Sequence, residues 1–125
     1  MAEEKRAFDR METEHSIRII GEDGSSFPAI AANISLTGLQ ILCDRPTMER
    51  ISARGLETKA AHEVLVRVRV TLPDMPENQN KLGLFGRVVA VRQGGQADEF
   101  RIGVQFTDYE PGSYNTLEHY LDMHL

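Results

Sequence analysis

The sequence predicts an all-β domain, a closed or nearly closed barrel of six antiparallel strands with a C-terminal α-helix. Apolar and polar residues alternate over several short segments, as they do in strands that bury one face. Turn-forming residues, chiefly Gly, Pro, Asn and Asp, separate these segments. The end of the chain instead carries apolar residues at the spacing of one helical face. Closure of the barrel would also remove the exposed strand edges that promote aggregation.

Three strands are predicted in the first part of the chain. Residues 16–20 alternate between polar and apolar side chains, and a Glu-Asp-Gly-Ser turn follows them. The next strand runs from Phe27 to about Ile34, and a third runs from Gly38 to Cys43. We expect the thiol of Cys43 to pack as a small apolar group within this third strand.

The middle of the chain contains the clearest strand and the weakest pattern. Residues 47–61 show little strand character, and we expect a short helical turn followed by a loop, with Gly55 stopping the helix. A half-buried strand follows. The apolar residues of its buried face are Val64, Val66, Val68, Val70 and Leu72. Two prolines in residues 73–80 then predict a polar loop outside any sheet.

The last two strands form a predicted hairpin. The strand over residues 82–92 contains Gly83 and Gly86, which indicate a bulge or a tight bend of the kind that turns the corner of a small barrel. A Gln-Gly-Gly-Gln turn leads to an alternating strand over residues 100–106, and the sheet is expected to end near Asp108.

A helix of about residues 113–124 is predicted to close the chain. Ser113 is a candidate cap for its first turn. Tyr114, Leu117 and Leu121 follow the i, i+3, i+7 spacing of one face. We expect this face to pack against the barrel.

The composition fits a single globular domain. The chain has 125 residues, of which 41% are hydrophobic and 26% charged, so it can enclose one core. Residues 1–13 are polar and charged, and we expect them to form a flexible N-terminal arm that can close on a ligand. Residues 14–125 are expected to form the barrel domain.

The charge and hydropathy exclude several classes of partner. A net charge of −5 argues against DNA or RNA, because nonspecific affinity for nucleic acid needs a basic surface. No apolar stretch approaches the roughly 20 residues that span a bilayer, and the first residues lack a signal-peptide core, so we expect a cytoplasmic protein without membrane insertion. The single cysteine agrees with a reducing compartment.

No arrangement of residues predicts catalysis or metal binding. The four histidines are dispersed, and His119 and Asp122, three residues apart, are expected to lie at an exposed helix end rather than to hold a metal. The chain has no glycine-rich phosphate loop and no nucleophile motif. We therefore expect a binding protein without enzymatic activity, cofactor or metal.

One polar turn carries groups suited to ligand binding. The run Asn33-Ile34-Ser35-Leu36-Thr37-Gly38 lies between two apolar runs, so it should be exposed at a strand end. Asn33 offers an amide, Ser35 offers a hydroxyl, and Gly38 allows either a positive φ or close approach of a ligand. Such groups can bind a flat polar edge, although the string alone is also typical of an ordinary turn.

The expected arm carries two arginines with complementary chemistry. Arg6 and Arg10 lie four residues apart in the charged N-terminal run. A guanidinium group can bind a phosphate or the O6/N7 edge of a guanine through two hydrogen bonds, and its plane can stack on a base. A solvated charge run is the ordinary interpretation of this pair in isolation.

Together and in this order, the two motifs resemble those of the PilZ domain family of cyclic di-GMP receptors. The resemblance covers nearly the whole chain and implies a six-stranded PilZ-type β-barrel with a C-terminal helix. The residues that it assigns to cyclic di-GMP are Arg6, Arg10, Asn33, Ser35 and Gly38. The resemblance places the guanidinium groups on guanine edges and phosphates and the turn on the remaining ligand edge. Asn33 stands where Asp is also common in the family, which replaces a charge-assisted contact with an amide contact.

The residue before the first arginine bears on stoichiometry. In PilZ domains an arginine there can bridge to a second ligand molecule, whereas an apolar residue tends to leave one. Lys5 keeps the positive charge but lacks the planar fork of arginine. Because a third cation would offset part of the repulsion between two stacked dianionic ligands, we expect two cyclic di-GMP molecules per chain.

The resemblance implies a receptor that changes shape on binding. The ligand would fix the arginines of the arm and create a new surface, and an unidentified effector protein would receive the signal. One alternative is a ligand-independent PilZ-fold adaptor in type IV pilus assembly, and another is a small barrel that binds nucleic acid or catalyses a reaction. The complete motifs favour the receptor over the adaptor. The acidic charge and the lack of catalytic motifs count against the third class.

Overall fold

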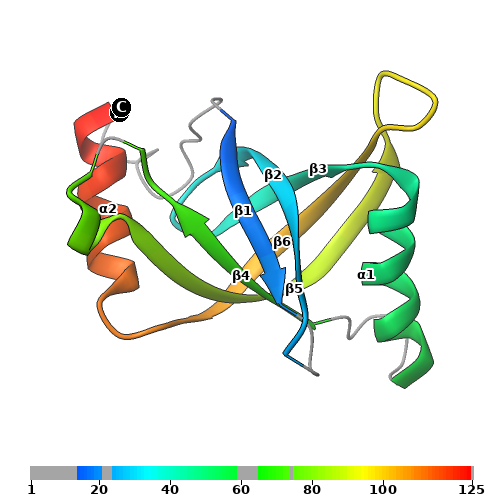
Figure 1. Ribbon diagram of the computed structural model, residues 1–125, viewed down its shortest axis with the longest axis horizontal. Coiled ribbons are helices and arrows are strands. Elements are labelled where there is room, and N and C mark those ends of the chain that lie inside the picture. Colours follow the sequence, from blue (N-terminus) through cyan, green and yellow to red (C-terminus); the bar gives the residue numbers. More distant parts are fainter. Residues whose placement is uncertain (1–13, 21–23, 59–64, 74, 125) are drawn as a thin grey trace.

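Six antiparallel strands close into a barrel, as the sequence predicts (Figure 1). The computed structural model describes residues 14–20, 24–58, 65–73 and 75–124, and the side chains of 52–58 are outside this description. The strands are β1 (His15–Ile20), β2 (Ser26–Ile34), β3 (Gly38–Cys43), β4 (Leu65–Thr71), β5 (Lys81–Gln93) and β6 (Phe100–Tyr109). Their order around the barrel is β1-β2-β3-β6-β5-β4, and β4 pairs with β1 to complete the closure.

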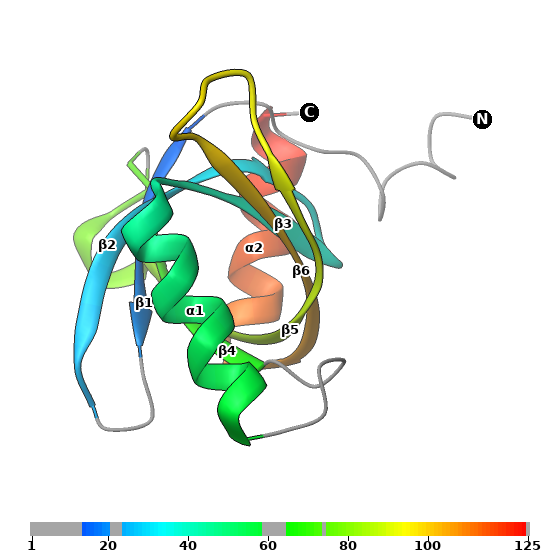
Figure 2. The same ribbon diagram turned by 90° about the vertical axis from the view of Figure 1, so that its right-hand side faces the viewer.

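Two α-helices lie at opposite ends of the barrel (Figures 1 and 2). They are α1 (Arg45–Thr58) and α2 (Ser113–His124), and a short 3-10 helix, η3 (Glu77–Gln79), interrupts the predicted polar loop between β4 and β5. Neither described α-helix is long and apolar enough to cross a bilayer.

Helix α1 corrects the prediction of a short helical turn and a loop over residues 47–61. It is 14 residues long and contains Gly55, which therefore does not stop it. The backbone N–H of Thr47 donates to the carboxylate of Asp44 at 3.0 Å, a side-chain cap of the first turn. This hydrogen bond is the main cause that holds the pKa of Asp44 below its ordinary value. Ile51 is buried and Met48 packs against the core, so tertiary contacts stabilise a helix whose sequence pattern is weak.

The core lies inside the barrel and follows the predicted alternation. Ile17 and Ile19 of β1 are buried, whereas Ser16 and Arg18 between them are exposed. The predicted buried face of β4 is confirmed where the structure describes it, and Val64 lies outside the described residues. The buried members are Val66, Val68, Val70 and Leu72.

Helix α2 buries a face that differs in part from the predicted one. Leu117 and Leu121 are buried as expected, but Tyr114 is 42% exposed and Tyr120 takes its place at 1%. The hydroxyl of Tyr120 lies 3.0 Å from Nε2 of His15 in β1, and both residues are buried. This polar contact lets a tyrosine fill the core, because its hydroxyl is not left without a hydrogen-bond partner.

Ser113 fastens α2 to the barrel. We predicted it as a helix cap, but it is the first residue of α2 and its hydroxyl accepts a hydrogen bond from the backbone N–H of Gly83 at 3.0 Å. This contact is buried and joins the start of the helix to β5. The predicted bulge in β5 is confirmed between Phe85 and Gly86, and a second irregularity lies between Val88 and Ala90.

Cys43 packs against the core as predicted. Partial burial, and secondarily the carboxylate of Asp44, raise the pKa of its thiol to about 11. Because the thiolate is the reactive form of cysteine, this residue is a poor nucleophile at neutral pH.

Strands β3 and β6 approach each other closely at Gly38, which pairs with Gln105. Gly38 does not have the positive φ that we considered for it. Among the described residues only Gly24 and Gly112 have one. A Cβ at position 38 would instead overlap the carbonyl oxygen of Val104. The position therefore requires glycine because the backbone of a neighbouring strand occupies the space of a side chain.

We predict that Gly38→Ala destabilises the fold by about 1–3 kcal/mol, because the added methyl group must displace the backbone of β6. Urea denaturation would measure the change. Gly103→Ala is a matched control on the same face, since the nearest atom to its added Cβ would be 3.5 Å away. Equal stabilities of the two variants would contradict this account of Gly38.

Candidate functional site

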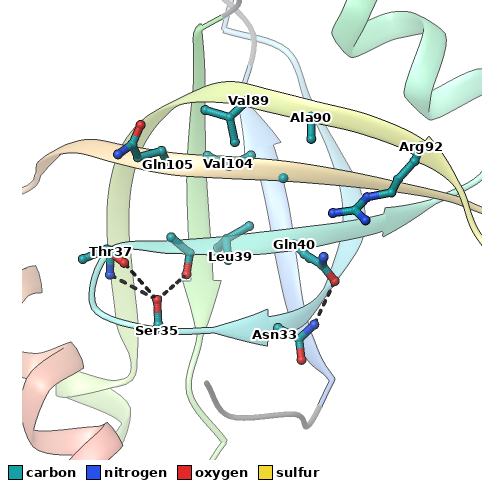
Figure 3. A pocket seen from close by; sticks show the side chains of 12 residues that line it. Asn33, Ser35, Thr37, Leu39, Gln40, Val89, Ala90, Arg92, Val104 and Gln105 are labelled. Atoms are coloured by element: carbon teal, nitrogen blue, oxygen red, sulfur yellow. Dashed lines mark hydrogen bonds between the residues drawn. The ribbon is translucent and has the colours of Figure 1, made fainter. Parts of the chain in front are cut away.

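A pocket of about 260 Å³ lies on the outer side of the barrel, where β3, β6 and β5 run side by side (Figure 3). The residues that line it come from these strands, from the end of β2 and from the turn between β2 and β3. They are Asn33, Ser35, Thr37, Gly38, Leu39, Gln40, Val89, Ala90, Arg92, Gly103, Val104 and Gln105. The pocket is therefore built around the polar turn that the sequence singled out.

The predicted site residues fall into two groups. Asn33, Ser35 and Gly38 all line the pocket, so the structure brings the three turn residues together. Lys5, Arg6 and Arg10 lie outside the described residues, and their place relative to the pocket stays a prediction.

The turn is held by hydrogen bonds of Ser35. The prediction that this run is exposed is wrong for its centre, because Ile34, Ser35 and Leu36 are buried. The backbone N–H of Ser35 donates to the carbonyl oxygen of Gly38 at 2.9 Å. Its hydroxyl oxygen accepts from the backbone N–H of Thr37 at 3.2 Å and also lies 3.3 Å from the carbonyl oxygen of Gly38. These contacts are internal to the turn (Figure 3). The serine hydroxyl, which we predicted as a ligand-binding group, is thus also a brace that sets the shape of the turn.

Strand β6 anchors the same turn from outside. The backbone N–H of Phe106 donates to the carbonyl oxygen of Thr37 at 2.8 Å, and the hydroxyl of Tyr109 donates to the carbonyl oxygen of Leu36. Burial, with a smaller effect of the Tyr114 side chain, raises the pKa of Tyr109. The phenol therefore keeps its proton at neutral pH and remains a donor. Pairing with β6 fixes the turn before any ligand arrives.

Asn33 lies opposite Gln40 in the β2–β3 ladder. Its side-chain Nδ2 donates to Oε1 of Gln40 at 2.8 Å. Oε1 also accepts a hydrogen bond from Nη1 of Arg101 in β6 at 3.3 Å. A line of polar side chains therefore crosses three strands at the edge of the pocket.

Three arginines of β5 and β6 border the pocket, and sequence reasoning did not assign them to the site. Arg92 lines the pocket and makes no hydrogen bond or ion pair with another described residue. Arg101 is its cross-strand partner, and Arg87 donates to the side-chain oxygen of Gln105 through Nε and Nη2 at 3.3 and 3.1 Å. None of the described residues that line the pocket is acidic. The pocket therefore lies in a locally basic environment on an acidic chain.

A signal for these arginines is present in the sequence. Arg92 and Arg101 lie on either side of the predicted turn, so the hairpin places their strands side by side, but a two-residue Gly94-Gly95 turn would pair Arg92 with Ala97. In the structure residues 94–99 connect the two strands, and Arg92 pairs with Arg101. Their approach to Asn33 could not be found in this way, because it depends on the pairing of β3 with β6. Within the described residues, no group of three His, Cys, Asp or Glu side chains is placed to hold a metal ion.

Solved structures of several proteins share the fold. The chain superposes on the Bacillus subtilis inhibitor of motility (MotI/DgrA) with a TM-score of 0.68 at 13% identity, covering 92% of this chain and 48% of that one. The PilZ domain of CeSA from a cellulose-synthesizing bacterium gives 0.57 at 15%, covering 93% and 97%. The PilZ domain of YcgR from Escherichia coli, solved with c-di-GMP, gives 0.58 at 12%, covering 92% and 87%. The chain spans about half the length of MotI/DgrA.

The sequence itself also matches a known family. A comparison with curated proteins yields no match. The sequence identity to the solved structures is so low that their similarity shows the fold alone. The PilZ domain family, however, matches residues 4–123 of the 125 residues. This range contains both the arginine pair and the polar turn, and the six-stranded barrel with its C-terminal helix agrees with it. The chain belongs to the PilZ domain family.

Proposed function

We propose that this protein is a cytoplasmic, non-catalytic receptor for cyclic di-GMP. The observation that carries the proposal is the pocket in which Asn33, Ser35 and Gly38 meet beside Arg92, with no acidic side chain among the described residues of its lining. Family membership supports the same ligand, and a solved PilZ domain of the same fold is named with c-di-GMP. The complete pair Arg6 and Arg10 supplies further cations for a ligand with two phosphates.

The size of the pocket indicates how the ligand would bind. Its volume of about 260 Å³ lies below the roughly 300–1,000 Å³ of pockets that enclose a drug-sized ligand. The described surface can therefore hold one part of a cyclic dinucleotide, such as a base. The N-terminal arm would cover the rest and place the guanidinium groups of Arg6 and Arg10 on the phosphates and guanine edges.

Within this proposal the turn and the arm have different tasks. The turn is held in place by β6 and presents a fixed polar edge, with Asn33 as the contact group and Gly38 permitting close strand approach. The arm closes on the bound nucleotide and forms a new surface with it. That surface would be recognised by an effector protein, through which the receptor acts.

Substitution of the arm arginines tests the proposal directly. We predict that Arg6→Ala or Arg10→Ala weakens cyclic di-GMP binding by about 2–5 kcal/mol, roughly 30-fold or more, because each removes one partner of a desolvated charge pair. Isothermal titration calorimetry would measure the affinity, and circular dichroism would show an unchanged fold.

Arg18→Ala is the matched control for charge. Arg18 is exposed on β1 and hydrogen-bonds to Ser26, away from the residues that line the pocket. We expect this variant to bind almost as tightly as the unmodified protein. Equal losses in all three variants would show that only net charge matters. Absence of binding by the unmodified protein would favour the adaptor alternative.

The stoichiometry is a separate prediction. Lys5, next to Arg6, would offset part of the phosphate repulsion between two stacked ligands, so we expect the titration to saturate at two cyclic di-GMP molecules per chain. Lys5→Leu should shift the saturation point toward one. Saturation of the unmodified protein at one ligand per chain would contradict this role for Lys5.

A further inference from the structure

Oε1 of Gln40 is a shared acceptor at the edge of the pocket. Nδ2 of Asn33 donates to it from β2 at 2.8 Å, and Nη1 of Arg101 donates to it from β6 at 3.3 Å. All three side chains are partly buried, so solvent competes less with these hydrogen bonds than it does at a fully exposed site. Asn33 and Gln40 are directly opposed in the β2–β3 ladder, which keeps their side chains on one face.

The chemistry of arginine fixes the direction of every hydrogen bond in this chain of three side chains. A guanidinium group can only donate, so Gln40 must turn its carbonyl oxygen, and not its NH2 group, toward Arg101. Asn33 must then present its NH2 group to that same oxygen. The carbonyl oxygen of Asn33, Oδ1, is left on the side away from Gln40 (Figure 3). Within the described residues Oδ1 accepts no hydrogen bond.

We propose that Arg101, acting through Gln40, orients the amide of Asn33 so that the turn presents a hydrogen-bond acceptor to the ligand. Arg101 and Gln40 are thus positioning residues, and Asn33 offers the face that an aspartate would offer at the same place. This inference rests on the proposed function, since it adds a basis for ligand choice to the proposed receptor site.

The orientation of the Asn33 amide determines which kind of base edge the turn can bind. An acceptor at Asn33 suits an edge that donates, as guanine does through its N1–H and its exocyclic amino group. At the two positions where guanine donates, adenine carries the lone pair of N1 and a C2–H, and its 6-amino donor lies at the other end of the edge. A buried polar group that meets a partner of the wrong kind costs affinity, which is the usual source of strong discrimination. The site is therefore set for guanine over adenine in a cyclic dinucleotide.

A double-mutant cycle separates positioning from charge. Arg101→Met keeps an unbranched, largely apolar stem but removes the guanidinium donor, so the Asn33 amide is free to turn over. We expect cyclic di-GMP affinity to fall roughly 2- to 10-fold, the range for one hydrogen bond. In an Asn33→Asp background both carboxylate oxygens accept, and without Arg101 the NH2 group of Gln40 can turn toward them. There the same Arg101→Met change should cause no loss of affinity.

Arg87→Met is the matched control. It also removes one positive charge beside the pocket, but Arg87 donates to the pocket-lining Gln105 and not to Gln40. If Arg101 positions Asn33, the loss of cyclic di-GMP affinity caused by Arg101→Met depends on whether residue 33 is Asn or Asp. The loss caused by Arg87→Met should be the same in both backgrounds. Equal losses for Arg101→Met in the unmodified protein and in the Asn33→Asp background, or no loss in either, would overturn the proposal.

The side-chain amide signals of the ligand-free protein test the positioning role of Arg101 separately from the proposed receptor function. In nuclear magnetic resonance spectra, one Nδ2 hydrogen of Asn33 should be shifted and protected by its bond to Gln40, and Arg101→Met should remove both features. An unprotected Asn33 amide in the unmodified protein would overturn the positioning role, whatever the ligand. A protected amide in a protein that binds no cyclic di-GMP would support the orientation and refute the receptor function.

Discussion

The antiparallel pairing of β3 with β6 is the constraint on which the candidate site depends. It joins the first three strands to the last two and runs from Gly38–Gln105 to Cys43–Phe100. These residues are distant in the sequence, so the site exists only once β3 has paired with β6. The pairing places the turn after β2 beside the arginines of the β5–β6 hairpin, and neither part would form the pocket alone.

The close fit of this pairing explains features that look separate in the sequence. Gly38 lacks a side chain because the Val104 carbonyl oxygen occupies its place. The turn keeps its shape because Ser35 bonds within it and β6 bonds to it through Phe106 and Tyr109. A ligand-binding surface built on paired strands is fixed in advance, which lowers the ordering cost of binding. In the proposed receptor the conformational change is consequently assigned to the N-terminal arm.

Local patterns predicted the strands well because alternation in a barrel reflects burial directly. The two apolar positions of β1 and the buried face of β4 are examples. The length of helix α1 was underestimated, because the Asp44 cap and the core contacts of Ile51 stabilise it. Such contacts are not visible in the spacing of apolar residues. The burial of Tyr120 in place of Tyr114 depended on its partner His15, at the other end of the chain.

The candidate site was predictable only where its residues are close together in the sequence. The turn motif identified Asn33, Ser35 and Gly38 from sequence, and all three line the pocket. The network from Asn33 through Gln40 to Arg101 was not predictable, since it crosses three strands whose order around the barrel is set by tertiary structure. The braced hydroxyl of Ser35 likewise shows that a motif residue can act by shaping the turn as well as by touching a ligand.

The most direct test of the account is a map of backbone amide shifts during titration with cyclic di-GMP. Two-dimensional 1H–15N nuclear magnetic resonance spectra would follow each residue of the chain. We expect the largest shifts on the turn and the start of β3 at 33–40, on 89–92 and on 103–105, together with residues 5–10. Shifts confined to α2 or to the β4 face, with the turn unchanged, would contradict the assignment of this pocket as the ligand site.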